Sequence, residues 1–283
     1  SLHVASLNTA ALRRLDLHDA DSPHPFHGVV HRDADGRPTG VVTEVFMMVP
    51  SPGDDAEFDD SVRRHGRGLF SAAGTTTVLT MPENLHQVEL QRALHERHEL
   101  TVRQRYYLIS PGVAGLAEAA RLRAREQTSD RFSFGGIKVF VNGCGHDGLG
   151  KPLEDAKWTQ DELTAFVTEA DRLGMQVWLH SLTAEGVRMA ARSVRSTTQG
   201  ANRLRHRIEH GGDFLDVVDL PLVASSGALM VTTPQFLHSM TADATGPRAP
   251  ARTILESGVP LLGGTDSTGT VPSSVSILGN VAT

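Results

Sequence analysis

From residue 74 onward, short apolar or β-branched runs alternate with amphipathic or alanine-rich segments, and this alternation constrains the fold more than any other feature. Seven of the runs have the length and composition of buried strands. They are TTTVLTM (75–81), VRQRYYLI (102–109), GIKVFVN (136–142), QVWLHS (176–181), HRIEHG (206–211), ALMVTTPQF (228–236) and VPLLGGTDS (259–267). Strands that alternate with helices at this spacing need crossover connections, so we expect them to be parallel.

The segments between these strands carry helix start and stop signals. The clearest is TQDELTAFVTEADRLG, in which Thr159 and Glu162 form a capping box and Gly174 follows the last turn. Its apolar residues recur at helical spacing and make one stripe. Further helices are expected near 61–73, 85–98, 112–127, 184–195, 214–226 and 248–257.

This α/β pattern fits either an open doubly wound sheet or a (β/α)8 TIM-like barrel. No Gly-x-Gly-x-x-Gly follows the first strand, and GGTDSTG lacks the Gly-Lys-Ser/Thr ending of a phosphate loop, so we favour the barrel. Only seven strands are found, and strand 1 is the one expected to be absent from this chain. Residues 61–283 would form strands 2–8, and residues 1–60 an insert covering the barrel mouth, with a hairpin around Asp35–Gly36.

Composition excludes several classes of protein. The 283 residues are 39% hydrophobic with a net charge of −6, and the basic residues are scattered, which argues against a nucleic-acid partner. The one cysteine cannot form an internal disulfide and fits a reducing compartment. No apolar run approaches the roughly 20 residues that span a bilayer. We therefore expect a cytoplasmic protein that binds a small-molecule substrate; homo-oligomerisation is compatible with this sequence.

Four polar residues follow apolar runs at the ends of predicted strands: Lys138, His180, His210 and Asp266. A unit of one strand and one helix occupies about 30 residues. The separation of 42 residues therefore corresponds to one such unit with a long loop, that of 30 to one unit, and that of 56 to two units. They would thus lie on strands 4, 5, 6 and 8. Because the carboxyl ends of barrel strands point into one site, we expect these side chains to meet there.

This set of residues is chemically coherent. Neutral imidazoles and a carboxylate suit Zn²⁺ or a similar divalent ion, as one or two ions. Such an ion makes water acidic enough to supply hydroxide near neutral pH. A carboxylate beside that water can accept its proton and return it to a leaving amine. A lysine ammonium is a poor ligand and becomes a bridging oxygen ligand only if CO2 carboxylates it.

Several stretches together resemble the amidohydrolase superfamily, in particular the branch that contains N-substituted formamide deformylase. They are HVASLNTAAL, RDADGRPTGVVTE, GIKVFVNG, VWLHS, RHRIEHG and GGTDS followed by VPSS, and their order and spacing agree along nearly all of the chain. The resemblance implies that Lys138 is the bridging ligand, that His180 and His210 are ligands, and that Asp266 is a ligand and the catalytic base. It also places His3 and Asn8 near the substrate.

The sequence departs from this family at three places. Asn142 stands where the branch usually has Asp, and Ser6 where it often has Trp. The superfamily supplies two more ligands from a His-x-His on strand 1, and none of the 14 histidines has that spacing. The missing strand, the missing ligands and two uncapped ends together lead us to expect an internal fragment of a longer protein.

Several of these residues also have a purely structural interpretation. His210 ends its strand and is the better ligand of its pair. His206 is expected to have a structural role or to support the site, for instance by hydrogen-bonding a neighbouring ligand. Glu209 would point behind the barrel and pair with Arg205 or Arg207. Asp266 could cap a turn, Lys138 could be a salt-bridged inner lysine, and His3 could be solvated. The remaining candidates are an inert loop thiol, Cys144, and two rim residues, His146 and His238.

We therefore expect a metal-dependent hydrolase of a non-peptide C–N bond, of the amide or N-formyl type. The alternatives are a metal-free barrel that binds a ligand or partner, and a hydrolase of the same superfamily that acts on an ester or deaminates a ring. The scaffold does not distinguish these substrates, because its motifs specify the activated water and not the bond it attacks.

Overall fold

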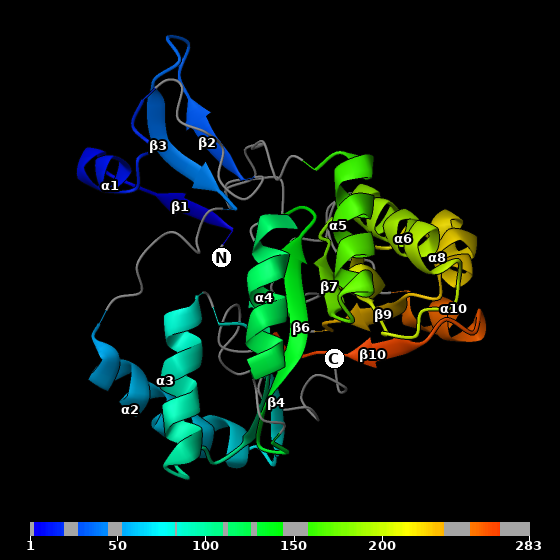
Figure 1. Cartoon of the computed structure of the whole chain (residues 1–283). Helices are drawn as coiled ribbons and strands as arrows, with labels where there is room; N and C mark the ends of the chain where they lie inside the picture. The colour runs from blue at the N-terminus through cyan, green and yellow to red at the C-terminus, as the bar shows by residue number, and fades with distance from the viewer. Residues whose placement is uncertain are drawn as a thin grey trace.

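The computed structural model describes residues 3–19, 28–44, 53–82, 84–109, 113–125, 129–143, 158–234 and 250–266. Within these ranges the strands form two sheets, one of seven parallel strands and one of three antiparallel strands (Figure 1). The large sheet carries helices along the chain between its strands, as expected for an α/β fold.

The seven predicted strands are all present in the large sheet. They are β4 (Thr77–Thr80), β5 (Arg103–Ile109), β6 (Phe132–Phe140), β7 (Gln176–His180), β8 (Arg207–Glu209), β9 (Leu229–Thr232) and β10 (Leu261–Gly263). The sheet order is β10-β9-β8-β7-β6-β5-β4, and every neighbouring pair is parallel. Strands in strict sequence order within a curled sheet are the arrangement of part of a TIM-like barrel (Figure 1).

Helices occur between the strands where the sequence predicts them. They are α3 (Leu85–Glu96), α4 (Val113–Arg125), α5 (Gln160–Arg172), α6 (Ala184–Thr198), α8 (Leu220–Ser226) and α10 (Ala251–Glu256). The capping box of α5 is confirmed, because the Thr159 hydroxyl accepts from the backbone N–H of Glu162 at 3.2 Å. In return, Glu162 accepts from the backbone N–H of Thr159 at 2.8 Å.

Two predicted helices have different boundaries. The helix expected over 61–73 begins earlier, as α2 (Asp55–His65), and continues as a π-helical segment, η3 (Gly66–Ser71). Asp54 and Glu57 form a capping box that starts it inside a loop-like stretch. The helix expected over 214–226 is divided into α7 (Gly211–Phe214), a 3-10 turn η4 (Val217–Asp219) and α8. Pro221 lies in the first turn of α8, where its missing N–H costs no helical hydrogen bond.

The two faces of the large sheet differ in chemistry because side chains alternate along each strand. Ile137, Val177, Ile208 and Met230 are fully buried in a core shared with the helices. On the opposite face, the register places Lys138, Trp178 and Arg207 side by side across three strands. One step toward the carboxyl ends, Phe140, His180 and Glu209 form the next row. The apolar face anchors the helices, and the other face carries the polar and aromatic residues.

The small sheet contains β1 (Val4–Ser6), β3 (Pro38–Thr43) and β2 (Val29–Arg32), in the order β1-β3-β2. The last two strands are the predicted hairpin around Asp35–Gly36. Helix α1 (Thr9–Arg14) packs on this sheet through a cluster of buried residues: Leu12, Leu17, Val30 and Val42. Just before β1, the ring of His3 lies 5.7 Å from that of Phe140, so the small sheet meets the carboxyl end of β6.

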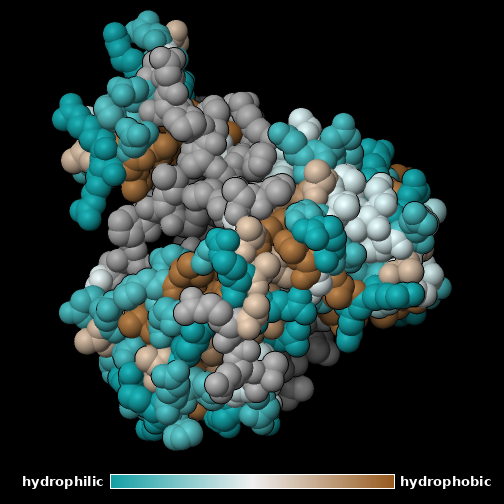
Figure 2. All heavy atoms as spheres, viewed as in Figure 1, coloured by the Kyte–Doolittle hydropathy of each residue, from teal (hydrophilic) through white to brown (hydrophobic). Residues whose placement is uncertain are grey.

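On the face shown in the space-filling view, hydrophilic residues cover most of the outer surfaces of the helices (Figure 2). Of the helices in the described residues, none has both the length and the apolar content needed to cross a membrane. The exposed large apolar residues include Leu79 and Met81, on and next to β4 at one edge of the large sheet.

Candidate functional site

Two histidines meet at the carboxyl end of the large sheet. His180 is the last residue of β7, and His210 follows β8 directly with a left-handed backbone (φ 61°). Their ring centroids lie 4.7 Å apart in an edge-to-face arrangement, and both side chains are buried. The structure therefore brings together the two histidines that the sequence identifies as ligands.

Burial keeps both imidazoles neutral. It lowers the pKa of His180 well below its ordinary value, and the nearby charge of Lys138 lowers it further. Burial and Lys138 also lower the pKa of His210, to about 3. The Nε2 atom of His180 is buried and has no hydrogen-bond partner among the described residues. A neutral, desolvated ring nitrogen of this kind is suited to hold a cation.

Lys138 lies in β6, two residues before its end, and its side chain is only 2% exposed. Its ammonium nitrogen is 5.5 Å from the centroid of the Phe140 ring. Burial lowers the pKa of Lys138, and the carboxylates of Glu209 and Asp266 oppose that effect. Asp266 follows β10 with a left-handed backbone (φ 41°), and the charge of its carboxylate acts to raise the pKa of Lys138. A lowered amine pKa favours the unprotonated form, which is the form that CO2 can carboxylate.

His3 reaches the site from the small sheet. Its ring centroid lies 4.7 Å from that of His180, and its Nδ1 atom is 2.8 Å from Oε1 of Glu44. Glu44 is 2% exposed, and no assignment from sequence included it. Its position directly after the hairpin strand β3 was the available indication. Asn8, by contrast, is exposed and caps α1, where its Oδ1 atom accepts from the backbone N–H of Ala11.

The polar and aromatic face of the large sheet, here called the inner face, carries a stack of aromatic and charged side chains next to the histidines. Arg207 donates from Nε to Oε1 of Glu209 at 2.6 Å, which confirms one of the two predicted partners. Its guanidinium carbon lies 3.9 Å from the centroid of the Trp178 ring, and that ring stacks on Tyr107. The expectation that Glu209 points behind the sheet is wrong, because the register places Glu209 beside His180 on the inner face.

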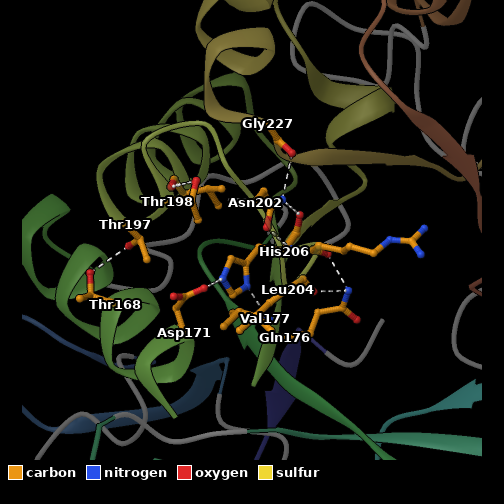
Figure 3. A network of polar contacts seen from close by, with 12 residues as sticks. Thr168, Asp171, Gln176, Val177, Thr197, Thr198, Asn202, Leu204, His206 and Gly227 are labelled. Atoms are coloured by element: carbon orange, nitrogen blue, oxygen red, sulfur yellow. Dashed lines mark hydrogen bonds and ion pairs between the residues drawn. The ribbon is translucent and has the colours of Figure 1, made fainter. Parts of the chain in front are cut away.

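His206 is fully buried. Its ring lies between Asp171 and Val177 (Figure 3). It precedes β8, and its Nδ1 atom accepts from the backbone N–H of Val177 at 3.0 Å. Its Nε2 atom lies 2.9 Å from Oδ1 of Asp171 on α5. Both ring nitrogens are thus occupied by groups that join β7 and α5. His206 holds elements together at the amino end of the sheet and hydrogen-bonds to neither His180 nor His210.

The remaining residues singled out in the sequence either have structural partners, lie on the surface or fall outside the described residues. Asn142 joins β6 to the start of α6, because its Oδ1 atom accepts from the backbone N–H of Leu182 at 2.9 Å and its Nδ2 atom donates to Thr183. Ser6 is an exposed residue of β1. Cys144, His146 and His238 lie outside the described residues.

The chemistry of these donors fits a divalent ion, although the set is incomplete. Two buried neutral imidazoles and an aspartate are donor types expected at such a centre, and the desolvated lysine would join them only once carboxylated. In the part of the chain that the structure describes, no three His, Cys, Asp or Glu residues lie close enough together to hold a metal. His180 and His210 thus form a pair of candidate ligands rather than a whole coordination sphere.

A family model described as the amidohydrolase family matches residues 1–283. No curated protein gives a significant match. Among solved structures, the chain is similar to an uncharacterized metal-dependent hydrolase from Pyrococcus furiosus, with 16% identity and a TM-score of 0.62 over 96% of this chain and 59% of that chain. A second such hydrolase, from Pyrococcus horikoshii OT3, gives 15% identity and a TM-score of 0.63 over 94% and 55%.

An Xaa-Pro dipeptidase is also similar, with 19% identity and a TM-score of 0.54 over 82% of this chain and 66% of that chain. At these identities the likeness concerns the fold. The chain spans between 55% and 66% of the length of these three proteins.

Proposed function

The chain belongs to the amidohydrolase family, and from this premise we propose that it carries part of the active site of a metal-dependent hydrolase that cleaves a non-peptide C–N bond. The observation that carries the proposal is the contact between His180 and His210, two buried and neutral imidazoles at the carboxyl end of a parallel sheet. Active sites of barrel enzymes lie at this end. The resemblance to the formamide deformylase branch supports an amide or N-formyl group as the substrate.

Each residue of the cluster has a proposed role. His180 and His210 would hold a divalent ion, most suitably Zn²⁺, through ring nitrogens, and Lys138 would join them after carboxylation. A bound ion of this kind supplies Lewis acidity and lowers the pKa of water toward about 7. Asp266 is proposed as a further ligand and as the base, whose carboxylate takes a proton from water and delivers it to the leaving nitrogen. His3, whose Nδ1 atom contacts Glu44, is proposed to contact the substrate.

The proposal is tested by Asp266→Asn in the natural protein. The amide keeps the size of the side chain but cannot act as a base at neutral pH. We expect turnover of an N-formyl amine to fall by about 100-fold or more, the usual contribution of such a group, while His180, His210 and carboxylated Lys138 still retain the metal. Metal analysis and release of formate are the two measurements.

Asp130→Asn is the matched control, because Asp130 is an exposed carboxylate on the chain far from β10 in sequence. It should leave both measurements unchanged. Near-normal turnover in Asp266→Asn would show that another group is the base. A purified protein that is free of metal and inactive toward amides, esters and ring amines would instead favour a binding role.

A further inference from the structure

The segment Glu209–His210–Gly211–Gly212–Asp213 forms a tight turn against β9, and hydrolysis of a C–N bond does not by itself explain its composition. His210 leaves the strand with a left-handed backbone, and the two glycines lie against the neighbouring strand. A Cβ atom on Gly211 would lie 2.8 Å from side-chain atoms of Ile208 and Met230. On Gly212 it would lie 3.1 Å from the backbone oxygen of Val231. The turn is therefore pressed onto β9.

The turn ends at Asp213, whose carboxylate is fully buried. Its Oδ1 atom accepts a short hydrogen bond from the Thr232 hydroxyl, and its Oδ2 atom accepts from the backbone N–H of Thr233 at 2.7 Å. A carboxylate of this kind is costly to bury unless its oxygens are hydrogen-bonded, and both oxygens here have a donor. Asp213 thus fixes the backbone at the end of β9.

The position of Thr233 affects His210, because the Thr233 hydroxyl contacts the imidazole of His210. The distance from Thr233 Oγ1 to His210 Nδ1 is 3.1 Å, and both side chains are buried. In a neutral imidazole one nitrogen carries the proton and the other has a lone pair. The partner of Nδ1 therefore decides which nitrogen of His210 is able to bind a cation.

We propose that Asp213 is a positioning residue for His210, acting through Thr233, and that it holds the imidazole as the tautomer protonated on Nδ1. Thr233 Oγ1 then accepts from Nδ1–H, and the lone pair of Nε2 is presented to the site. The inference rests on the proposed role of His210 as a ligand. It adds two residues, Asp213 and Thr233, that neither bind the ion nor contact the reacting atoms in this assignment.

The test is nitrogen NMR of the histidine rings in the metal-free 283-residue chain, at a pH above the pKa of Asp213, which burial raises to about 6. The ring shifts distinguish a protonated from an unprotonated nitrogen at each position. We expect His210 to carry its proton on Nδ1 in the unmodified chain. Thr233→Val removes the hydroxyl and keeps the shape, so the proton should move toward Nε2, the tautomer that a free side chain prefers.

Three further variants isolate the cause. Thr233→Ser restores the hydroxyl and should restore the Nδ1–H tautomer. Thr232→Val is the matched control on the same strand, since it removes a hydroxyl from Asp213 but not from His210, and the tautomer should persist. Asp213→Asn replaces an acceptor with a donor and should loosen Thr233, giving a mixture of tautomers. If Asp213→Asn does not fold, the pair Thr233→Val and Thr233→Ser still tests whether Thr233 sets the tautomer of His210.

The inference is overturned if His210 is protonated on Nε2 in the unmodified chain or if Thr233→Val leaves the tautomer unchanged. A folded Asp213→Asn variant with the unmodified tautomer would reject the role of Asp213. Because the measurement needs neither metal nor substrate, its failure leaves the hydrolase proposal standing. Conversely, an inactive full-length protein whose His210 carries its proton on Nδ1 would reject the proposed activity and retain the positioning role.

Discussion

At the scale of single residues, the two histidines of RHRIEHGG are separated by what their rings contact. The Nδ1 atom of His210 contacts a threonine hydroxyl, and its ring packs edge-to-face with that of His180. His206 has both nitrogens bonded within the scaffold, one to a backbone N–H and one to Asp171. The same side chain therefore serves a proposed ligand role at one position and a structural role four residues earlier.

The contacts of His206 predict a dependence of stability on pH. Burial lowers its pKa in the folded protein, and Asp171 only partly opposes this effect. The unfolded chain therefore binds a proton near pH 6.5 while the folded chain does not, so stability is present above that pH and lost as pH falls below it. We expect the free energy of unfolding in urea to fall less steeply below pH 6.5 in His206→Asn than in the unmodified chain. Parallel curves would show that another group controls this range.

The inner-face position of Glu209 could not be predicted from sequence, and the reason is local. Alternation assigns a face only within a strand, and β8 contains just three residues. His210 reaches the site through a left-handed turn after the strand ends, so counting back from His210 gives Glu209 the wrong face. Glu44 and Asp213 were missed for another reason: their importance depends on contacts with residues distant in the chain or on a neighbouring strand.

At the scale of elements, β6 contains two consecutive glycines that allow its neighbours to approach. A Cβ atom on Gly136, which has φ +153°, would lie 2.2 Å from the backbone oxygen of Gln176 on β7. A Cβ atom on Gly135 would lie 2.4 Å from the ring of Tyr107, which stacks on Trp178. These glycines thus let an aromatic ring from β5 pack across β6 onto a ring from β7.

Gly136→Ala should therefore be strongly destabilising. Backbone strain and overpacking each cost about 1–3 kcal/mol, so we expect the free energy of unfolding to fall by about 2–5 kcal/mol. Chemical denaturation followed by circular dichroism measures this. Gly68→Ala is the control, because a Cβ atom there meets nothing within 4 Å and the backbone is not left-handed. Equal effects in the two variants would contradict the packing explanation.

Elements whose signals are local were predictable. The strands of the large sheet and the capping box of α5 follow from periodicity and from Thr159 and Glu162, which lie three residues apart. The start of α2 was not predicted, because Asp54 and Glu57 sit in a stretch whose composition is typical of a loop. The segment after β8 is divided because the turn formed by His210 and Asp213 contacts β9. A contact of this kind leaves no periodic pattern in the sequence.

At the scale of the whole molecule, the large sheet has two edges among the described strands. β4 pairs only with β5, and β10 pairs only with β9. Leu79 on β4 is 43% exposed and Met81 just after it is 37% exposed. An edge strand with exposed apolar side chains is a template for pairing with another chain.

We therefore expect the 283-residue chain to associate at high concentration through β4. Leu79→Lys places a charge on that edge and should lower the average mass measured by sedimentation velocity across a concentration series. Val218→Lys is the control, because Val218 is 77% exposed on the 3-10 turn, away from either sheet edge. Association that is equally reduced in both variants would point to net charge, and association unchanged in Leu79→Lys would exclude the β4 edge.

The strict sequence order of the large sheet has a consequence for how the protein is made. Each strand pairs with the strand synthesised just before it, so a ribosome-bound chain can add strands one by one to an existing edge. Lys138, His180, His210 and Asp266 emerge in that order, and Asp266 follows the last described strand. In the proposed assignment the cluster is thus complete only after β10 has joined the sheet, when the other six described strands of that sheet have already been synthesised.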